Sequence, residues 1–175
     1  MPEPATSVRA VERCEGCGFD YDLDEAAGAG ADIVRGVEQL AALLRRDGID
    51  AMTRRHPQLW SPLEYGCHVR DVLLVQRERV LAARREDRPS FAPMGRDERV
   101  DHDGYAEQAV GDVARQLADA ATLFANVLAR LGPEDWERSV VYNYPAPAER
   151  SLRWVAVHTV HEVRHHLFDV RRQAA

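Results

Sequence analysis

Four long segments with apolar residues at helical spacing are the feature that most constrains the fold of this chain. They cover roughly residues 25–46, 61–85, 104–131 and 151–172. Each segment has one apolar stripe that needs a partner to bury it, and almost no stretch shows the alternation of a strand. The sequence therefore predicts an all-α fold, a four-helix bundle of antiparallel type.

The ends of these helices carry recognisable signals. Ser61 can cap the second helix, Pro62 suits its first turn, and Glu64 stands where it can complete a capping box. The polar, proline-containing residues 87–103 predict a loop, and residues 142–149 predict another connection. Connections of this length are unusual in a compact bundle, so we expect the loops to line a site.

Length and charge exclude several classes of protein. The 175 residues suit one domain, which we expect to span 1–175, with an N-terminal segment at 1–23 and the bundle at 24–175. The net charge is −6, so nucleic acid is not an expected partner. All 23 basic residues are arginine, which excludes Schiff-base chemistry and a P-loop lysine.

The sequence also indicates the cellular compartment in which the protein is expected. Residues 1–10 lack a charged start followed by an apolar run, and no segment is apolar enough to span a membrane. We therefore expect a cytoplasmic protein. We also expect a monomer or homodimer without a membrane partner. In that compartment its three cysteines are reduced thiols or metal ligands rather than disulfides.

Four of the seven histidines fall within the last helix, which makes it the most informative part of the chain. They are His158, His161, His165 and His166. Residues four apart on a helix share a face and can bind one metal ion, and both His161/His165 and Glu162/His166 have this spacing.

A helical wheel separates these two pairs. The core-facing arc is defined by Leu152, Val155, Ala156, Val160, Val163, Leu167 and Val170. Glu162 and His166 lie at the edge of this arc, whereas His161 and His165 lie on nearly the opposite side.

His68 lies in the apolar stripe of the second helix, where a bundle can bring it against Glu162 and His166. Three protein ligands would leave an open coordination position for water, a thiol or a substrate carbonyl. The alternative is that His68 is a hydrogen-bonded core histidine and Glu162 a surface carboxylate.

Cys14 and Cys17 have the spacing of half a zinc site. His161 and His165 face away from the bundle core and could complete a closed Cys2His2 site, a short knuckle that would fix the N-terminal segment to the last helix. Cys67 points about 100° away from its neighbour His68, so it is not an expected ligand. The alternatives are a redox-active Cys-x-x-Cys pair or two unligated thiols.

Two motifs resemble the DinB-like superfamily: Trp60-Ser61-x2-Glu64-x3-His68-Val69-x-Asp71 and His158-x3-Glu162-x2-His165-His166-x2-Asp169-Val170. The resemblance spans about residues 24–172 and implies a bundle with a divalent metal held by one histidine of the second helix and an i,i+4 pair of the fourth. Glu162, His166 and Asp169 match the maleylpyruvate isomerase branch, and His161/His165 equally match the His-x3-His form of other branches. The Cys-x2-Cys-Gly-Phe start is similar to that of some actinobacterial members.

The superfamily includes metal-dependent S-transferases that use bacillithiol or mycothiol. The resemblance therefore implies a metal-dependent thiol transferase, isomerase or hydrolase acting on a small electrophile. His68, Glu162 and His166 would hold the metal, with Asp169 and His158 orienting them. Zinc is the expected ion, with nickel or iron as alternatives and a low-molecular-weight thiol as cosubstrate. A non-catalytic zinc-stabilised binding module and a thiol redox protein or metal sensor are the other hypotheses.

Overall fold

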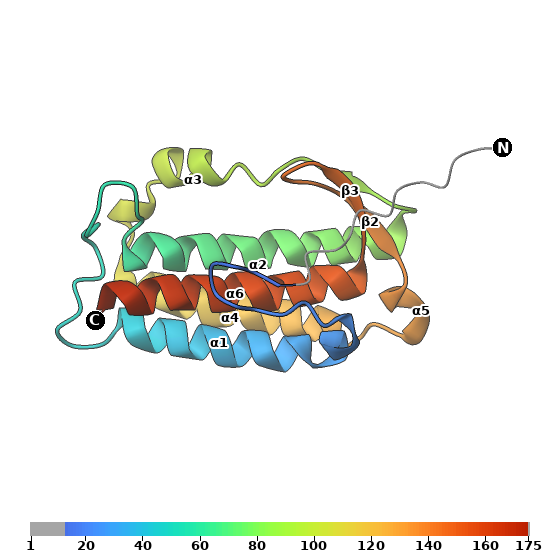
Figure 1. Cartoon of the computed structure of the whole chain (residues 1–175), viewed down its shortest axis with the longest axis horizontal. Coiled ribbons are helices and arrows are strands. Elements are labelled where there is room, and N and C mark those ends of the chain that lie inside the picture. The colour runs from blue at the N-terminus through green and yellow to red at the C-terminus, as the bar shows by residue number, and fades with distance from the viewer. Residues whose placement is uncertain (1–12, 175) are drawn as a thin grey trace.

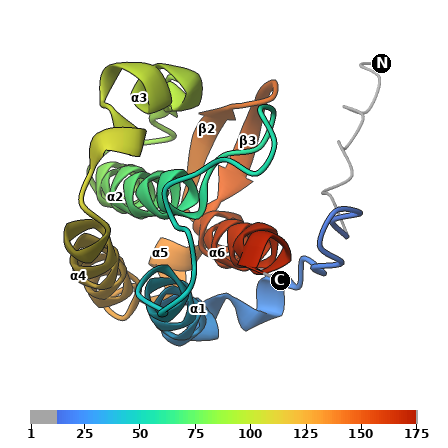
Figure 2. The same ribbon diagram turned by 90° about the vertical axis from the view of Figure 1, so that its left-hand side faces the viewer.

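A computed structural model describes residues 13–174, and its core is a bundle of four helices (Figure 1). They are α1 (Ala29–Leu44), α2 (Pro62–Arg85), α4 (Val110–Leu128) and α6 (Leu152–Ala174). Seen end-on in Figure 2, α1 and α2 are diagonal to each other, and each packs against both α4 and α6. The prediction of a four-helix bundle is confirmed.

The direction of the helices differs from a simple antiparallel arrangement. In Figure 1, α2 and α4 run one way along the bundle while α1 and α6 run the other. The chain between α2 and α4 must therefore return along the bundle. That return carries β1 (Ser90–Phe91), α3 (Arg96–His102) and the short 3-10 helix η2 (Tyr105–Glu107) over α2. Residues 87–103, expected to be a loop, are this covering layer.

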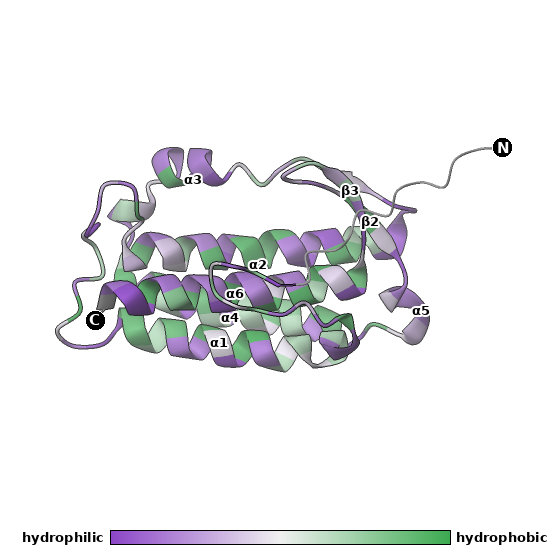
Figure 3. Cartoon of the chain, in the orientation of Figure 1, coloured by the Kyte–Doolittle hydropathy of each residue, from purple (hydrophilic) through white to green (hydrophobic). Residues whose placement is uncertain are grey.

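The bundle core forms where the apolar stripes meet, and Figure 3 shows these stripes along the helices. Its fully buried side chains include Ile33, Leu40, Leu73, Leu117, Phe124 and Val155. The helices α1 and α6 approach closely at Gly36, where an added Cβ would lie 2.6 Å from Val163 Cγ1. Among the described residues, no helix combines the length and apolar character needed to cross a membrane.

The start of α2 is fixed by the predicted capping box. The Ser61 hydroxyl accepts a hydrogen bond from the Glu64 backbone N–H at 3.2 Å, and Glu64 Oε2 accepts one from the Ser61 backbone N–H at 2.7 Å. Arg54 pairs with the buried Glu64 carboxylate and compensates its charge. This cap fixes the first turns of α2, the part of the helix that carries His68.

The expectation of almost no strand was wrong. A three-stranded sheet lies over α2, in the order β1-β2-β3, with β2 (Ser139–Asn143) parallel to β1 and antiparallel to β3 (Pro147–Ser151). In β2 the side chains of Val140 and Tyr142 are buried against the bundle, which gives the strand one apolar face. The β2–β3 hairpin leads directly into α6.

Two helix boundaries also differ from prediction. The first segment begins as a 3-10 helix, η1 (Leu23–Gly28), before α1. The third is shorter than expected because Gly104 has a positive φ of 60° and Gln108 is extended, which separates η2 from α4. At its far end α4 is followed by the short α5 (Pro133–Trp136).

Candidate metal centre

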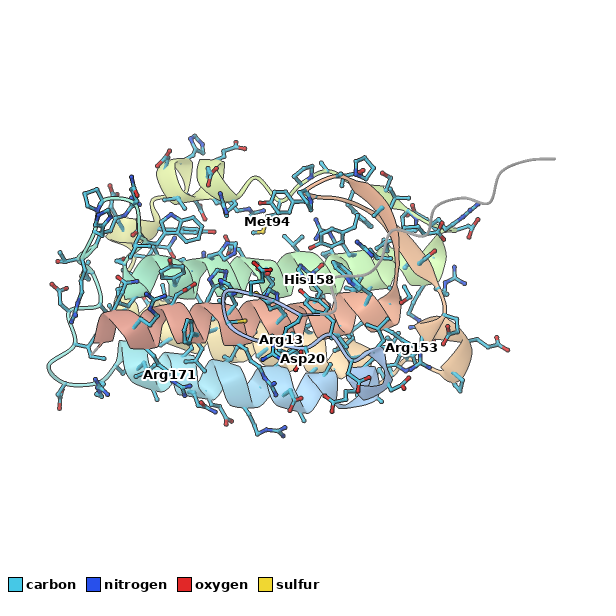
Figure 4. All side chains as sticks on the ribbon, in the orientation of Figure 1. Arg13, Asp20, Met94, Arg153, His158 and Arg171 are labelled. Carbon is cyan, nitrogen blue, oxygen red and sulfur yellow. The ribbon has the colours of Figure 1, made fainter. Side chains whose placement is uncertain are left out.

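Helix α6 presents ligand side chains on two adjoining faces. Its predicted core residues are buried, including Val155, Val163 and Val170. One ligand face borders α2, and Figure 4 places His158 between these two helices. The wheel therefore assigned the core of α6 correctly, with Glu162 and His166 at the edge of the core arc.

The structure brings His68 of α2 together with Glu162 and His166 of α6. One donor atom from each of the three lies within 4.8 Å of the others. Glu162 Oε2 is 3.8 Å from His68 Nε2 and 3.6 Å from His166 Nε2. The His68 side chain is 4% exposed, while those of His166 and Glu162 are 15% and 22% exposed, so solvent reaches the group from the Glu162 side.

These spacings fit a shared cation. At 3.6 and 3.8 Å the imidazoles are too far from Glu162 Oε2 for good hydrogen bonds. Donors bound at about 2.0 to 2.1 Å to one tetrahedral ion would lie roughly 3.4 Å apart, close to the observed separations. His68 Nδ1 is buried without a hydrogen-bond partner among the described residues, which argues against a core histidine satisfied by hydrogen bonds.

Asp169 orients one of these groups. Its Oδ2 lies 3.1 Å from His166 Nδ1, so the ring can donate its Nδ1 proton and leave Nε2 free as a donor to a metal. The same carboxylate oxygen is 3.7 Å from His165 Nε2. Asp169 therefore contacts histidines of both faces of α6.

Two aromatic rings lie beside this group, and one cation packs on one of them. The Trp60 ring centroid is 5.2 Å from that of His68, and the Tyr65 centroid is 5.2 Å from that of His166. The Arg96 guanidinium lies 5.5 Å from the centre of the Trp60 ring, at the start of α3. The site thus has an apolar wall and a positive charge at its edge.

The pKa values of the three ligand side chains are shifted from their ordinary values. Burial alone would raise the pKa of Glu162, but His161, His166 and His68 together hold it well below its usual value. Burial opposes protonation of His166, yet Asp169 and Glu162 raise its pKa to about 9. Burial lowers the pKa of His68 despite the nearby Glu162 carboxylate. The metal-free group therefore contains a carboxylate, one cationic ring and one neutral ring near neutral pH.

The second predicted ligand set is also brought together. Donor atoms of Cys14, Cys17, His161 and His165 all lie within 4.8 Å of one another. Cys14 Sγ is 3.6 Å from His165 Nδ1. Cys67 belongs to neither group, because its buried thiol faces Gln108 Oε1 at 3.6 Å.

Tyr21 is a site residue that the sequence did not single out. Its hydroxyl lies 2.9 Å from both His158 Nδ1 and His161 Nδ1, so it bridges two histidines one turn apart on α6. Burial, then the Glu162 charge, raise the pKa of Tyr21, so the phenol stays protonated and can donate to one ring while accepting from the other. The only sequence signal was an aromatic pair, Phe19 and Tyr21, directly after the cysteines.

His158 is held differently from the other histidines. It stacks on Trp154 with ring centroids 4.4 Å apart, and its Nε2 faces Glu162 Oε1 at 3.8 Å. Burial lowers the pKa of His158 to about 4, so the ring is neutral at physiological pH. A third potential metal group, made of His158, His161 and Glu162, overlaps the other two. Tyr21 already contacts both of its rings.

Comparison with known proteins identifies the family. The DinB superfamily model matches residues 33–168, most of the chain. The chain belongs to the DinB superfamily. A solved structure, YfiT from Bacillus subtilis, superposes with a TM-score of 0.69 at 14% identity over 86% of each chain. It is described as a probable metal-dependent hydrolase with an unusual four-helix bundle topology. None of the curated proteins searched matches.

The superfamily resemblance drawn from the sequence is confirmed, and the likeness to YfiT supports the fold. The actinobacterial subtype stays a prediction.

Proposed function

We propose that this DinB superfamily protein is a metal-dependent enzyme that hydrolyses a small electrophilic substrate. The observation that carries the proposal is the convergence of His68 Nε2, His166 Nε2 and the Glu162 carboxylate between α2 and α6, at separations suited to one divalent ion. Three protein ligands leave a coordination position for water or substrate. Zinc is the ion we propose first, with nickel or iron as alternatives.

The protein groups have separable roles. His68, Glu162 and His166 would hold the ion, which when bound lowers the pKa of a coordinated water or thiol and polarises a substrate carbonyl. Asp169 accepts a hydrogen bond from His166 Nδ1, and this contact fixes which nitrogen of the ring faces the site. His158 is neutral and lies beside the other carboxylate oxygen, with its Nε2 3.8 Å from Glu162 Oε1.

The walls of the site suggest the substrate class. Trp60 and Tyr65 offer flat apolar surface beside the ligand rings, while Arg96 places a positive charge over Trp60. A small molecule with an apolar body and a carboxylate would suit both features. A cavity of about 290 Å³ elsewhere along α2, lined by Asp71 and Arg79 among others, includes none of the three ligands and is not assigned to substrate.

The nucleophile separates hydrolysis from thiol transfer. A metal that lowers the pKa of water would do the same for a low-molecular-weight thiol, so S-transfer and thiol-assisted isomerisation use the same ligand set. We place hydrolysis first because the structural relative YfiT is described as a probable metal-dependent hydrolase. A non-catalytic binding module would instead need the fourth coordination position to be closed by protein.

The experiment compares nucleophiles on one metal-loaded protein. The chain is stripped with chelator, reloaded separately with zinc, nickel or iron(II), and assayed against small esters, amides and epoxides with and without an added thiol. We expect turnover that requires metal and does not require the thiol. Product that forms only with the thiol would identify a transferase or isomerase instead.

Matched variants connect the activity to the proposed ligands. His68→Ala and His166→Ala should abolish turnover, whereas His102→Ala, an exposed histidine on α3, should leave it unchanged. Turnover that survives in both ligand variants, or in chelator-treated protein, would show that this site is not the catalytic centre.

A further inference from the structure

We propose that Cys14, Cys17, His161 and His165 form a second, closed metal site that takes a tetrahedral divalent ion of the zinc class. It has a structural role, fixing the N-terminal turn to α6. The donor set is the one that structural zinc sites use, two thiolates and two imidazoles. This site shares no ligand with the group formed by His68, Glu162 and His166, and the proposal does not depend on that group being catalytic.

The spacing of the donors supports a common ion. A sulfur and a nitrogen bound to one tetrahedral zinc at about 2.3 and 2.0 Å lie roughly 3.5 Å apart. Cys14 Sγ and His165 Nδ1 are 3.6 Å apart, and all four donors fall within 4.8 Å of one another. This separation suits two ligands of the same ion, and all four donors are gathered at comparable spacing.

The backbone turn that carries the cysteines is built to approach α6. The Gly18 N–H donates to the Cys14 carbonyl at 2.7 Å, and Gly18 has a positive φ of 73° that suits glycine. A Cβ at Gly16 would lie 3.1 Å from His165 Cε1, so the backbone there runs close against the imidazole ring. Both cysteines can therefore reach α6 on one side of a tight turn.

Neighbouring groups leave one nitrogen of each histidine free for the ion. The Tyr21 hydroxyl is hydrogen-bonded to His161 Nδ1 at 2.9 Å. His161 Nε2 is buried and has no hydrogen-bond partner in the described part of the chain. Asp169 faces His165 Nε2 at 3.7 Å, which leaves His165 Nδ1 toward Cys14. A buried nitrogen without a partner is costly unless something binds it.

The site would supply a cross-link between distant parts of the chain. In Figures 1 and 2 the turn lies beside α6, outside the ring of four helices. Figure 4 shows Arg13 and Asp20, the residues at the base of the turn, and their side chains form an exposed ion pair of 3.7 Å. Exposed pairs of this kind contribute little. The four ligands would therefore attach the turn itself to α6, next to the contacts that Tyr21 makes with His158 and His161.

Cobalt(II) substitution tests the proposal on the full chain. Thiolate ligands give cobalt a sulfur-to-metal charge-transfer absorption that imidazole and carboxylate ligands do not. We expect this absorption in the wild-type protein and in His68→Ala, and its complete loss in Cys14→Ser. Bound metal per chain, measured by plasma mass spectrometry, should fall by one ion in Cys14→Ser and in His161→Ala. Circular dichroism confirms that each variant retains the bundle.

Cys67→Ser is the matched control, because it removes the one cysteine outside the site. We expect it to keep the charge-transfer absorption and the wild-type metal content. The proposal is overturned if Cys14→Ser keeps both, or if metal-replete protein contains a Cys14–Cys17 disulfide by mass spectrometry. Loss of metal in His68→Ala with the sulfur absorption intact would support the second site independently of any activity.

Discussion

Protons should compete with the metal at the His68, Glu162 and His166 site, and the competition should be confined to one ring. His166 has a pKa of about 9, because Asp169 and Glu162 stabilise its cation against the effect of burial. The pKa values of His68 and Glu162 lie below their usual values, so both are already deprotonated at neutral pH. Binding of one ion at pH 7 should therefore release close to one proton, from His166.

The size of this effect follows from the pKa of His166. At pH 7, two units below that pKa, about one molecule in a hundred has the neutral ring that a metal needs. Apparent affinity should rise roughly tenfold per pH unit between about pH 7 and pH 9 and then level off. The whole change amounts to about 3 kcal/mol of binding free energy.

Asp169→Asn provides the matched perturbation. An asparagine oxygen can still accept the His166 Nδ1 proton and keep the ring orientation, but it removes the charge that raises the pKa of His166. The affinity should then level off at a lower pH. We would measure zinc affinity by competition with a chromophoric chelator, in a Cys14→Ser/Cys17→Ser background that leaves one site. An affinity that is flat from about pH 7 to pH 9, or the same profile in both proteins, would refute the reasoning.

Three further predictions concern stability and are measured by urea denaturation of chelator-treated protein. Gly36→Ala should destabilise by about 1–3 kcal/mol, because its Cβ would lie 2.6 Å from Val163 Cγ1, whereas Gly111→Ala, with no atom within 4 Å, should be neutral or stabilising. Ser61→Ala should cost about 1 kcal/mol through loss of the α2 cap. His158 has a folded pKa of about 4 against an ordinary 6.5, so the unfolded chain binds more protons in that interval. The free energy of unfolding should therefore fall by about 3 kcal/mol from pH 6.5 to pH 4, and less in His158→Gln.

Each of these has an outcome that would contradict it. Equal stability of the two glycine variants would mean that α1 and α6 are not in close contact at Gly36. An unchanged free energy of unfolding in Ser61→Ala would mean that the cap does not contribute to stability. An acid dependence identical in wild type and His158→Gln would mean that other groups cause it.

The sequence predicted α2 and α6 well because both helices carry strong local signals. Ser61 and Glu64 mark one end of α2, and the regular apolar stripe of α6 assigns its buried face. The sheet was missed because β3 spans Pro147–Ser151, a polar edge strand with no apolar alternation. The pairing of β1 with β2 depends on tertiary contacts, such as the hydrogen bond from the Val141 N–H to the Pro89 carbonyl at 2.9 Å. No local pattern encodes that contact.

The candidate site was partly predictable for the same reason. The i,i+4 spacing predicted that Glu162 and His166 share one face of α6 and that His161 and His165 share another. The helical wheel showed that these two faces differ. Spacing could not show that Tyr21 bridges His158 and His161, because that contact joins residues more than a hundred positions apart. Local sequence gives the direction of a side chain on its own helix, while its partners depend on how distant segments pack.

The two i,i+4 pairs on α6 are better understood as two ligand faces than as alternative registers of one site. His161/His165 and Glu162/His166 are offset by one residue, about 100° around the helix, so one pair faces the cysteine turn and the other faces α2. Asp169 lies between them, with one oxygen 3.1 Å from His166 Nδ1 and 3.7 Å from His165 Nε2. A single carboxylate therefore orients His166 and lies beside His165, a ligand of the other proposed site. Because Asp169 binds His166 and lies next to His165, a change of occupancy at one site should shift this carboxylate and alter the metal affinity at the other.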